Sequence, residues 1–232
     1  MNGGWEDGCE KKCCLPFIEL SRTSTLYSMN PDHRFDCIIP VAGLSSRMSS
    51  WKPLIDFQGR PMIQHVVDKS LRVCERVILV SGYRGEELEE LFSTYKKVEC
   101  IRNEEYKRGM FSSIQTGAAL VKTPWFFITL GDMPAIPVTI FTRLAEEADR
   151  DKRTDIIRPV YRANPGHPVL LRRSVAATIR EQSYEADMRT VFSVHSQKFQ
   201  RRILNLDVDA AGCVYDIDTD SDLNADPKVS GE

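Results

Sequence analysis

One segment of the chain places small and cationic residues at spacings suited to binding phosphate. It runs from Ala42 through Gly43 and Ser45 to Arg47 and Lys52, directly after an apolar run. Gly43 lets the backbone turn sharply and approach a ligand closely, and the N–H groups and hydroxyls that follow can bind phosphate oxygens. Arg47 offers a planar guanidinium that can bind two phosphate oxygens, whereas Lys52 offers a mobile point charge. A solvated loop is the alternative, but the complete set of residues favours phosphate binding.

This segment matches neither of two common nucleotide-binding motifs. The G-x4-G-K-[ST] spacing of a P-loop is absent, and so is the G-x-G-x-x-G fingerprint of dinucleotide-binding proteins. The sequence therefore disfavours a P-loop hydrolase and a nicotinamide-dependent dehydrogenase.

A second segment places one carboxylate at the end of the most apolar run of the chain. Asp132 follows Gly131 after residues 125–130 (WFFITL) and precedes a proline-stiffened turn. In this position a carboxylate can coordinate Mg²⁺ on a triphosphate. The alternative is an aspartate that caps the next helix, which is a common role for this residue type. We favour the metal ligand.

Four aspartates alternate near the C-terminus: Asp216, Asp218, Asp220 and Asp222. On an extended strand Asp216 and Asp218 would point to opposite faces, so we expect only one of them to face a ligand. The pattern is partly like an EF-hand, but the glycine and the distal glutamate of that motif are absent, which excludes calcium binding. Asp220 and Asp222 are interpreted as capping or solvated residues.

Two further loops could contact the organic part of a substrate. Gly109 precedes Ser112 and Ser113 at the start of a predicted helix. Their hydroxyls could bond to a base or a ribose, or could cap the helix. The second loop presents His167 between two prolines and a glycine. Substrate contact and a structural role both remain open for this imidazole.

The elements that position these residues alternate between apolar runs and helical patterns. The ligand crevice of an open α/β sheet lies outside the carboxyl ends of its strands, where these loops fall. The alternation predicts an α/β fold with a Rossmann-like, mostly parallel mixed sheet and helices on both faces. Beyond residue 154 it breaks, which predicts added strands and a lobe over one end of the sheet. Predicted strands cover residues 36–42, 77–80, 98–101, 125–130, 156–161, 169–171 and 203–208, and predicted helices 61–73, 88–95, 111–121, 138–148, 175–181 and 188–195.

Composition limits the class of protein. A chain of 232 residues accommodates one sizeable α/β domain, which we place at residues 35–227 after a flexible extension over residues 1–34. The net charge of −2 disfavours a nucleic-acid-binding surface, and no apolar run is long enough to span a membrane. The seven cysteines and the absence of a secretory signal predict reduced thiols in a cytoplasmic protein. Cys9, Cys13 and Cys14 match no standard zinc spacing and are interpreted as free thiols.

Five ordered motifs resemble the MobA-like nucleotidyltransferases, and most of all their molybdenum cofactor cytidylyltransferase branch. The similarity runs from residue 35 to residue 222, with compatible spacing throughout. The motifs are Ala42-Gly43-x-Ser45-x-Arg47-Met48-x3-Lys52, Gly109-x2-Ser112-Ser113, Gly131-Asp132-Met133-Pro134, Gly166-His167-Pro168-Val169-Leu170 and Asp216-Ile217-Asp218-Thr219.

This resemblance implies a Mg²⁺-dependent nucleotidyltransferase and a role for each motif. Arg47 and Lys52 would contact the triphosphate and act in catalysis together with Asp132, while Asp132 and Asp218 would hold Mg²⁺. The base or the ribose would lie against residues 109–113. The implied nucleotide-binding residues are Ala42, Gly43, Ser45, Arg47, Lys52, Gly109, Ser112 and Ser113.

The resemblance also implies the acceptor. Gly166, His167 and Pro168 would line the side that takes a phosphorylated pterin, so that a nucleotide passes to a molybdopterin-type cofactor and pyrophosphate leaves. A molybdenum hydroxylase would be the client. Relatives that use GTP tend to have glycine where Ala42 stands, and the extra methyl group narrows the base pocket, which favours CTP. Two alternatives stay open: a nucleotidyltransferase for a sugar phosphate or another small phosphate, and a catalytically silent nucleotide-binding protein that assists molybdenum enzyme maturation.

Overall fold

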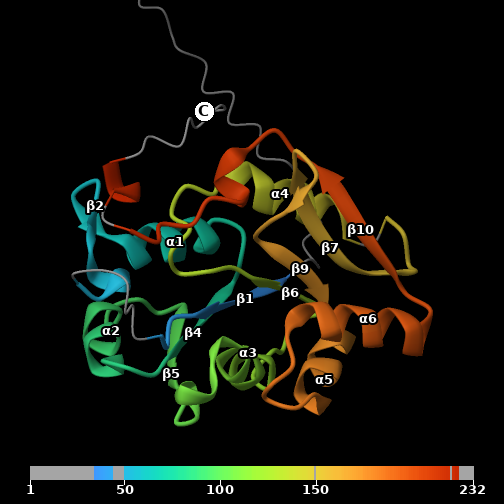
Figure 1. The fold of residues 1–232 in the computed structure, drawn as a ribbon, viewed down its shortest axis with the longest axis horizontal. Helices are drawn as coiled ribbons and strands as arrows, with labels where there is room; N and C mark the ends of the chain where they lie inside the picture. The colour runs from blue at the N-terminus through green and yellow to red at the C-terminus, as the bar shows by residue number, and fades with distance from the viewer. Residues whose placement is uncertain (1–33, 44–49, 149, 220, 225–232) are drawn as a thin grey trace, which may run out of the picture.

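A sheet of eight strands forms the centre of the protein in the computed structural model, which describes residues 34–43, 50–148, 150–219 and 221–224 (Figure 1). Apart from residue 34, the predicted flexible extension and its three cysteines lie outside these residues. The strands are β1 (Phe35–Pro40), β4 (Arg76–Ser81), β5 (Val98–Arg102), β6 (Trp125–Ile128), β7 (Thr154–Tyr161), β8 (Asn164–Pro165), β9 (Val169–Arg172) and β10 (Arg202–Asp207), and a separate hairpin joins β2 (Asp56–Phe57) and β3 (Arg60–Pro61).

The sheet is mixed and mostly parallel, as the alternation of elements predicts. Its order is β10-β7-β9-β6-β1-β4-β5, with β8 against β7. The pairs β6–β1, β1–β4, β4–β5 and β10–β7 are parallel, whereas β9 runs antiparallel to both of its neighbours. The chain proceeds from β1 to β4 and β5 on one side and then returns to β6 on the other. Ligands of open α/β sheets bind at such a point of reversal, outside the carboxyl ends of the strands.

Helices cover both faces of the sheet, as predicted (Figure 1). Ile39 of β1 packs in the cluster under α1 and α4, while its neighbour Ile38 packs in the cluster under α3, α5 and α6. The strand is thus buried on both faces, which explains its continuous apolar sequence. None of the helices in the described ranges combines the length and apolar character needed to cross a bilayer. The helices are α1 (Met62–Leu71), α2 (Gly85–Leu91), α3 (Met110–Ala118), α4 (Val138–Glu147), α5 (Arg173–Glu181) and α6 (Met188–Phe199).

The part of the chain beyond residue 154 differs from the prediction in one respect. Instead of forming a separate lobe over one end of the sheet, β7, β9 and β10 extend the sheet itself past β6. The helices α5 and α6 then continue the layer that α3 begins. The same core therefore runs under both halves of the chain.

Candidate active site

The loops that follow β1 and β6 lie in contact because these two strands are parallel neighbours. Gly131, after β6, packs against Val41, after β1. A Cβ atom on Gly131 would lie 2.4 Å from Cγ1 of Val41, well inside van der Waals contact. Glycine is thus required here to bring Asp132, the next residue, beside the loop that carries Lys52.

Three predicted site residues meet at this point. Lys52 begins a short 3₁₀ helix (Lys52–Leu54), and its Nζ donates hydrogen bonds to Oδ1 of Asp218 at 2.5 Å and to Oδ2 of Asp132 at 3.3 Å. The partners lie 166 and 80 residues away in the sequence. The side chain of Lys52 is only 14% exposed, so the ion pairs are partly shielded from water.

Backbone hydrogen bonds hold the C-terminal aspartates beside Asp132. The N–H of Ile217 donates to the carbonyl of Asp132 at 3.0 Å, and the Ile217 side chain is buried against the β2–β3 hairpin and α1. Asp222 accepts from the N–H groups of Asp218 at 3.0 Å and Thr219 at 2.7 Å, which agrees with its predicted capping role. Asp220 lies outside the described residues.

Asp216 is a third carboxylate at the same place. One oxygen each of Asp132, Asp216 and Asp218 lie within 4.8 Å of one another. The expectation that only one of Asp216 and Asp218 faces the ligand is wrong, because this segment forms no β-strand and its side chains do not alternate strictly. The run of aspartates was a usable signal, but the assumed strand geometry excluded one of them.

The electrostatics of this acidic cluster suit a divalent cation. Burial raises the pKa of Asp132 and the nearby Asp216 raises it further, although the Lys52 ammonium acts in the opposite direction. Burial alone would lower the pKa of Lys52, but its bonds to Asp218 and Asp132 outweigh that effect and raise it. Among the residues that the structure describes, three carboxylates against one ammonium leave excess negative charge. Oxygen ligands of this kind are those that Mg²⁺ and Mn²⁺ prefer.

The glycine segment is described only at its two ends. Ala42 is buried, Gly43 is exposed, and Nε1 of Trp51 donates to the carbonyl of Gly43 at 3.0 Å. This bond ties the end of β1 to the residue directly before Lys52. Ser45 and Arg47 lie outside the described residues, so their predicted contacts with phosphate stay predictions.

The loop before α3 uses its two serines inside the protein. Gly109 has a φ of +105°, a conformation that favours glycine. Ser112 and Ser113 are buried, and their hydroxyls accept from Nδ2 of Asn103 at 2.8 and 3.0 Å. Ser112 also donates to the carbonyl of Gly109 at 2.8 Å. These contacts favour the structural role, while contact between this loop and a nucleotide stays a prediction.

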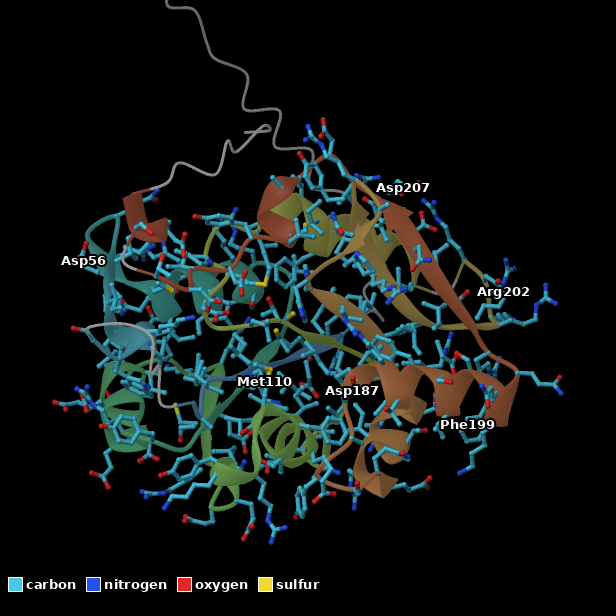
Figure 2. The ribbon with its side chains drawn as sticks, in the orientation of Figure 1. Asp56, Met110, Asp187, Phe199, Arg202 and Asp207 are labelled. Atoms are coloured by element: carbon cyan, nitrogen blue, oxygen red, sulfur yellow. The ribbon has the colours of Figure 1, made fainter. Side chains whose placement is uncertain are left out.

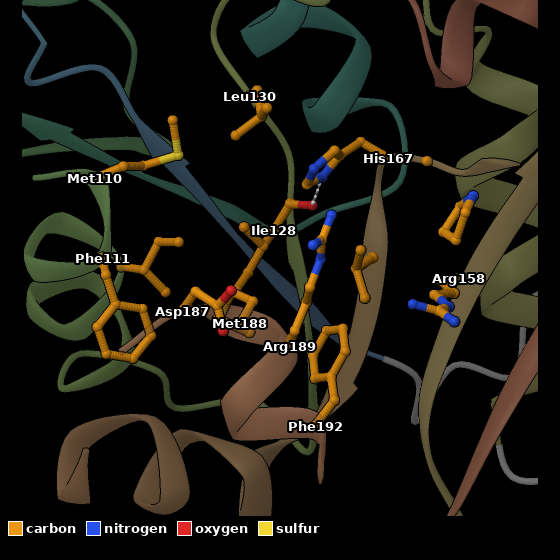
Figure 3. Close-up of a pocket in the computed structure, with 14 residues that line it drawn as sticks. Met110, Phe111, Ile128, Leu130, Arg158, His167, Asp187, Met188, Arg189 and Phe192 are labelled. Carbon is orange, nitrogen blue, oxygen red and sulfur yellow. Dashed lines mark hydrogen bonds between the residues drawn. The ribbon is translucent and has the colours of Figure 1, made fainter. Parts of the chain in front are cut away.

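The loop around His167 lines a cavity of about 460 Å³ next to the acidic cluster (Figure 3). A Cβ atom on Gly166 would lie 2.2 Å from the carbonyl oxygen of Cys213, so only glycine fits there. Nδ1 of His167 donates to the carbonyl of Ile128 at 3.4 Å, and burial lowers the pKa of the imidazole. A neutral ring that donates through Nδ1 leaves Nε2 as an acceptor. Pro168 follows as a buried residue.

A smaller cavity of about 190 Å³ adjoins the first one and is lined by Gly43, Lys52 and Asp132. Met110 and Leu130 line both cavities. Met110 stands at the start of α3 and Asp187 directly before α6, and both line the larger cavity (labelled in Figure 2). The two spaces therefore meet at the carboxyl edge of the sheet, which gives room for two substrates side by side.

Sequence comparisons agree with this arrangement. The model of the MobA-like NTP transferase domain matches residues 37–200. The molybdenum cofactor cytidylyltransferase of Escherichia coli is 30% identical over 188 residues, which cover 81% of this chain and 93% of that protein. A 3-deoxy-manno-octulosonate cytidylyltransferase of Actinobacillus pleuropneumoniae is 30% identical over 119 residues, which cover 50% of this chain and 46% of that protein.

Solved structures share the fold at lower identity. Rv0371c from Mycobacterium tuberculosis superposes with a TM-score of 0.67 at 19% identity, over 83% of this chain and 97% of that one. A CMP:2-keto-3-deoxy-manno-octonic acid synthetase complexed with CTP superposes with a TM-score of 0.65 at 17% identity, over 83% and 96% of the two chains. With the family model matching most of its length, the chain belongs to the MobA-like NTP transferase family.

Proposed function

We propose that this protein transfers CMP from CTP to the phosphate of a molybdopterin-type acceptor and releases pyrophosphate. The observation that supports it most is the meeting of Lys52 with Asp132, Asp216 and Asp218 beside a larger cavity. A triphosphate needs cationic groups and a metal, and an acceptor needs separate space within reach of the α-phosphate.

The reaction is a single in-line displacement. An oxygen of the acceptor phosphate attacks the α-phosphorus of CTP, the bond to the β-phosphate breaks, and its electron pair leaves with pyrophosphate. Positioning and charge neutralisation account for such catalysis without a covalent enzyme intermediate. Lys52 offsets the charge that grows on the leaving pyrophosphate.

Asp132, Asp216 and Asp218 would hold the divalent cation. When bound there, the cation neutralises phosphate charge and fixes the phosphate oxygens in position. The excess negative charge of the cluster supports this assignment. A Rv0371c structure in complex with manganese, with a TM-score of 0.61 at 18% identity, is consistent with it.

Two observations support CTP over other nucleotides. A relative that matches most of this chain's length is named for cytidylyl transfer, and one solved structure with the same fold is a complex with CTP. Ala42 is buried directly before the glycine loop. We infer from the family resemblance that its methyl group narrows the space for a base, which would favour a pyrimidine over a purine.

The test is a panel of CTP, GTP, ATP and UTP, each with Mg²⁺ and molybdopterin, scored by pyrophosphate release. We expect release with CTP that depends on both the acceptor and the metal, and little with GTP. Sugar 1-phosphates serve as competing acceptors, and a preference for one of them would replace the pterin. Binding of a nucleotide without any pyrophosphate release would identify a silent binding protein instead.

A further inference from the structure

The larger cavity extends well beyond the place where the proposed transfer occurs. The reacting phosphate of the acceptor must lie beside Lys52 and Asp132, at the end that Met110 and Leu130 share with the smaller cavity. The remaining space reaches past His167 to the first turn of α6. An acceptor that fills it places further groups in this space, beyond its phosphate.

The walls of this cavity are mainly apolar. Phe111 and Ile114 of α3 face it on one side, and Val169 of β9 and Phe192 of α6 on another. All four are buried residues of the core and are thus fixed in place. Such walls suit a flat heterocycle, and the free Nε2 of the neutral His167 can accept a hydrogen bond from a ring N–H group.

Two arginines bring positive charge to this part of the cavity. Arg158 comes from β7 and Arg189 from the first turn of α6, and both line the cavity. In Figure 3 the Arg189 side chain extends toward His167, while Arg158 stands across the cavity on the neighbouring strand. Nε of Arg158 donates to Oδ1 of Asn205 at 2.7 Å, which holds the guanidinium in place.

The acidic residue of this cavity has a role of its own. Asp187 accepts from N–H and Oγ1 of Thr190, both at 2.8 Å, and so caps α6. Asp187 is exposed. The hydrogen bonds from Thr190, together with the positive charge of the nearby Arg189, hold the pKa of Asp187 below its usual range. Among the lining residues that the structure describes, two guanidinium groups against one capping carboxylate and a neutral imidazole leave the cavity cationic.

We propose that Arg158 and Arg189 bind a second anionic group of the acceptor, distinct from the reacting phosphate. This inference rests on the proposed function. For a molybdopterin-type acceptor the second group is the dithiolate, or the oxo-metal group built on it, because a pterin ring itself carries no negative charge at neutral pH. Guanidinium groups recognise such anions through charge-assisted hydrogen bonds.

The experiment measures equilibrium binding of two ligands through pterin fluorescence, under anaerobic conditions and without nucleotide. One ligand is molybdopterin, and the other is a pterin phosphate that lacks the two sulfur atoms. We expect Arg189→Gln and Arg158→Gln each to weaken molybdopterin binding by about 10- to 100-fold. Binding of the sulfur-free ligand should stay unchanged. Arg189→Lys should recover part of the lost affinity because it keeps the charge.

Arg173→Gln is the matched control, since Arg173 is exposed in the first turn of α5 and lies outside the residues that line the cavity. Thermal unfolding of every variant shows whether the fold is intact. Equal weakening of both ligands would mean that the arginines bind the phosphate and would overturn the inference. So would unchanged binding of molybdopterin, or a wild-type protein that does not bind it.

Pyrophosphate release separates this inference from the proposed function. If molybdopterin binding depends on the arginines but no nucleotide gives pyrophosphate, the proposed transfer fails and the anion site stands. If CTP-dependent transfer proceeds while both arginine variants bind molybdopterin as the wild type does, the anion site alone fails.

Discussion

Lys52 is the cationic side chain that contacts two carboxylates of the acidic cluster, and its removal is the most direct test of the chemistry. Lys52→Met should lower kcat for pyrophosphate release by ~10² or more, because its charge acts mainly as the leaving group departs. Lys107→Met is the matched control, because Lys107 is exposed at the end of the turn that precedes Gly109. Normal turnover by the Lys52 variant would refute its role.

Asp216 is assigned to the metal by geometry alone, so its substitution tests the structure rather than the sequence pattern. Asp216→Asn should raise the Mg²⁺ concentration needed for half-maximal activity by about 10-fold or more, as loss of a ligand-sphere carboxylate does. Direct titration with Mn²⁺ gives the same comparison without turnover. Asp209→Asn, at an exposed position of the same segment, should behave as the wild type. An unchanged metal requirement would remove Asp216 from the site.

At the scale of single residues, the sequence predicts the place of a site residue when that residue directly follows a strand. Asp132 follows β6 closely, so its place at the carboxyl edge of the sheet could be predicted from the strand. Lys52 and Asp218 come from longer loops, and the family resemblance rather than strand position predicts that they meet it. The sequence does not predict that Asp216 joins this cluster, because Asp216 lies in an irregular segment. No periodic pattern tells which way the side chains of such a segment point. Arg158 comes from β7 and Arg189 from α6. The packing of these two elements brings both side chains to one cavity, and local sequence patterns do not encode that packing.

The loop that carries His167 is fixed by the contact between Gly166 and the segment that contains Cys213. Gly166→Ala would place a Cβ atom against the carbonyl of Cys213 and push the two segments apart. We expect the KM for the acceptor to rise by about 10- to 100-fold, since small displacements of a binding element have effects of this size. The KM for CTP should stay near that of the wild type.

Asn164→Ala is the control for this substitution, because Asn164 is exposed in the β8 strand of the same loop and its side chain bonds only locally to Arg162. Circular dichroism and thermal unfolding show whether Gly166→Ala still folds. A parallel rise in the KM for both substrates would mean that the loop supports the whole site rather than the acceptor side.

At the scale of elements, the predicted strands and helices agree with the structure because their apolar patterns are strong. Strand β1 is buried on both faces and reads as an unbroken apolar run, and β6 does the same. Of the expectations for the later part of the chain, the added strands are confirmed, whereas the lobe over one end of the sheet is wrong. Strand β9 inserts antiparallel between β6 and β7, and this depends on pairing between distant segments rather than on local sequence. The two-residue strands β2 and β3 are too short to show any period.

At the scale of the whole molecule, the end of the sheet opposite the site is held by an ion-pair network around the buried Asp36. Arg76 starts β4, and its guanidinium donates to both oxygens of Asp36 in β1 at 3.0 Å and to Glu99 in β5 at 2.7 Å. Asp36 also accepts from the backbone N–H groups of Lys122 at 2.7 Å and Thr123 at 3.3 Å. One carboxylate thus joins the central strand β1, its neighbour β4 and the turn that leads into β6.

Asp36→Asn should lower the free energy of unfolding at pH 7 by about 3 kcal/mol, because it leaves the partly buried guanidinium of Arg76 with a weaker partner. Burial alone would raise the pKa of Asp36, but the bonds from Arg76, Lys122 and Thr123 outweigh it and hold that pKa below its usual range. The carboxylate therefore contributes fully to the free energy of unfolding above its pKa in the unfolded chain, which is about 3.9. This contribution is lost as the pH falls through the lower pKa of the folded protein. Urea unfolding should give a constant difference in the free energy of unfolding between wild type and variant from about pH 8 to pH 5, and a smaller difference below about pH 4.

Since the network lies far from the acidic cluster along β1, kcat at neutral pH should not change. A difference in stability that is the same at every pH would mean that Asp36 acts through packing rather than through its charge.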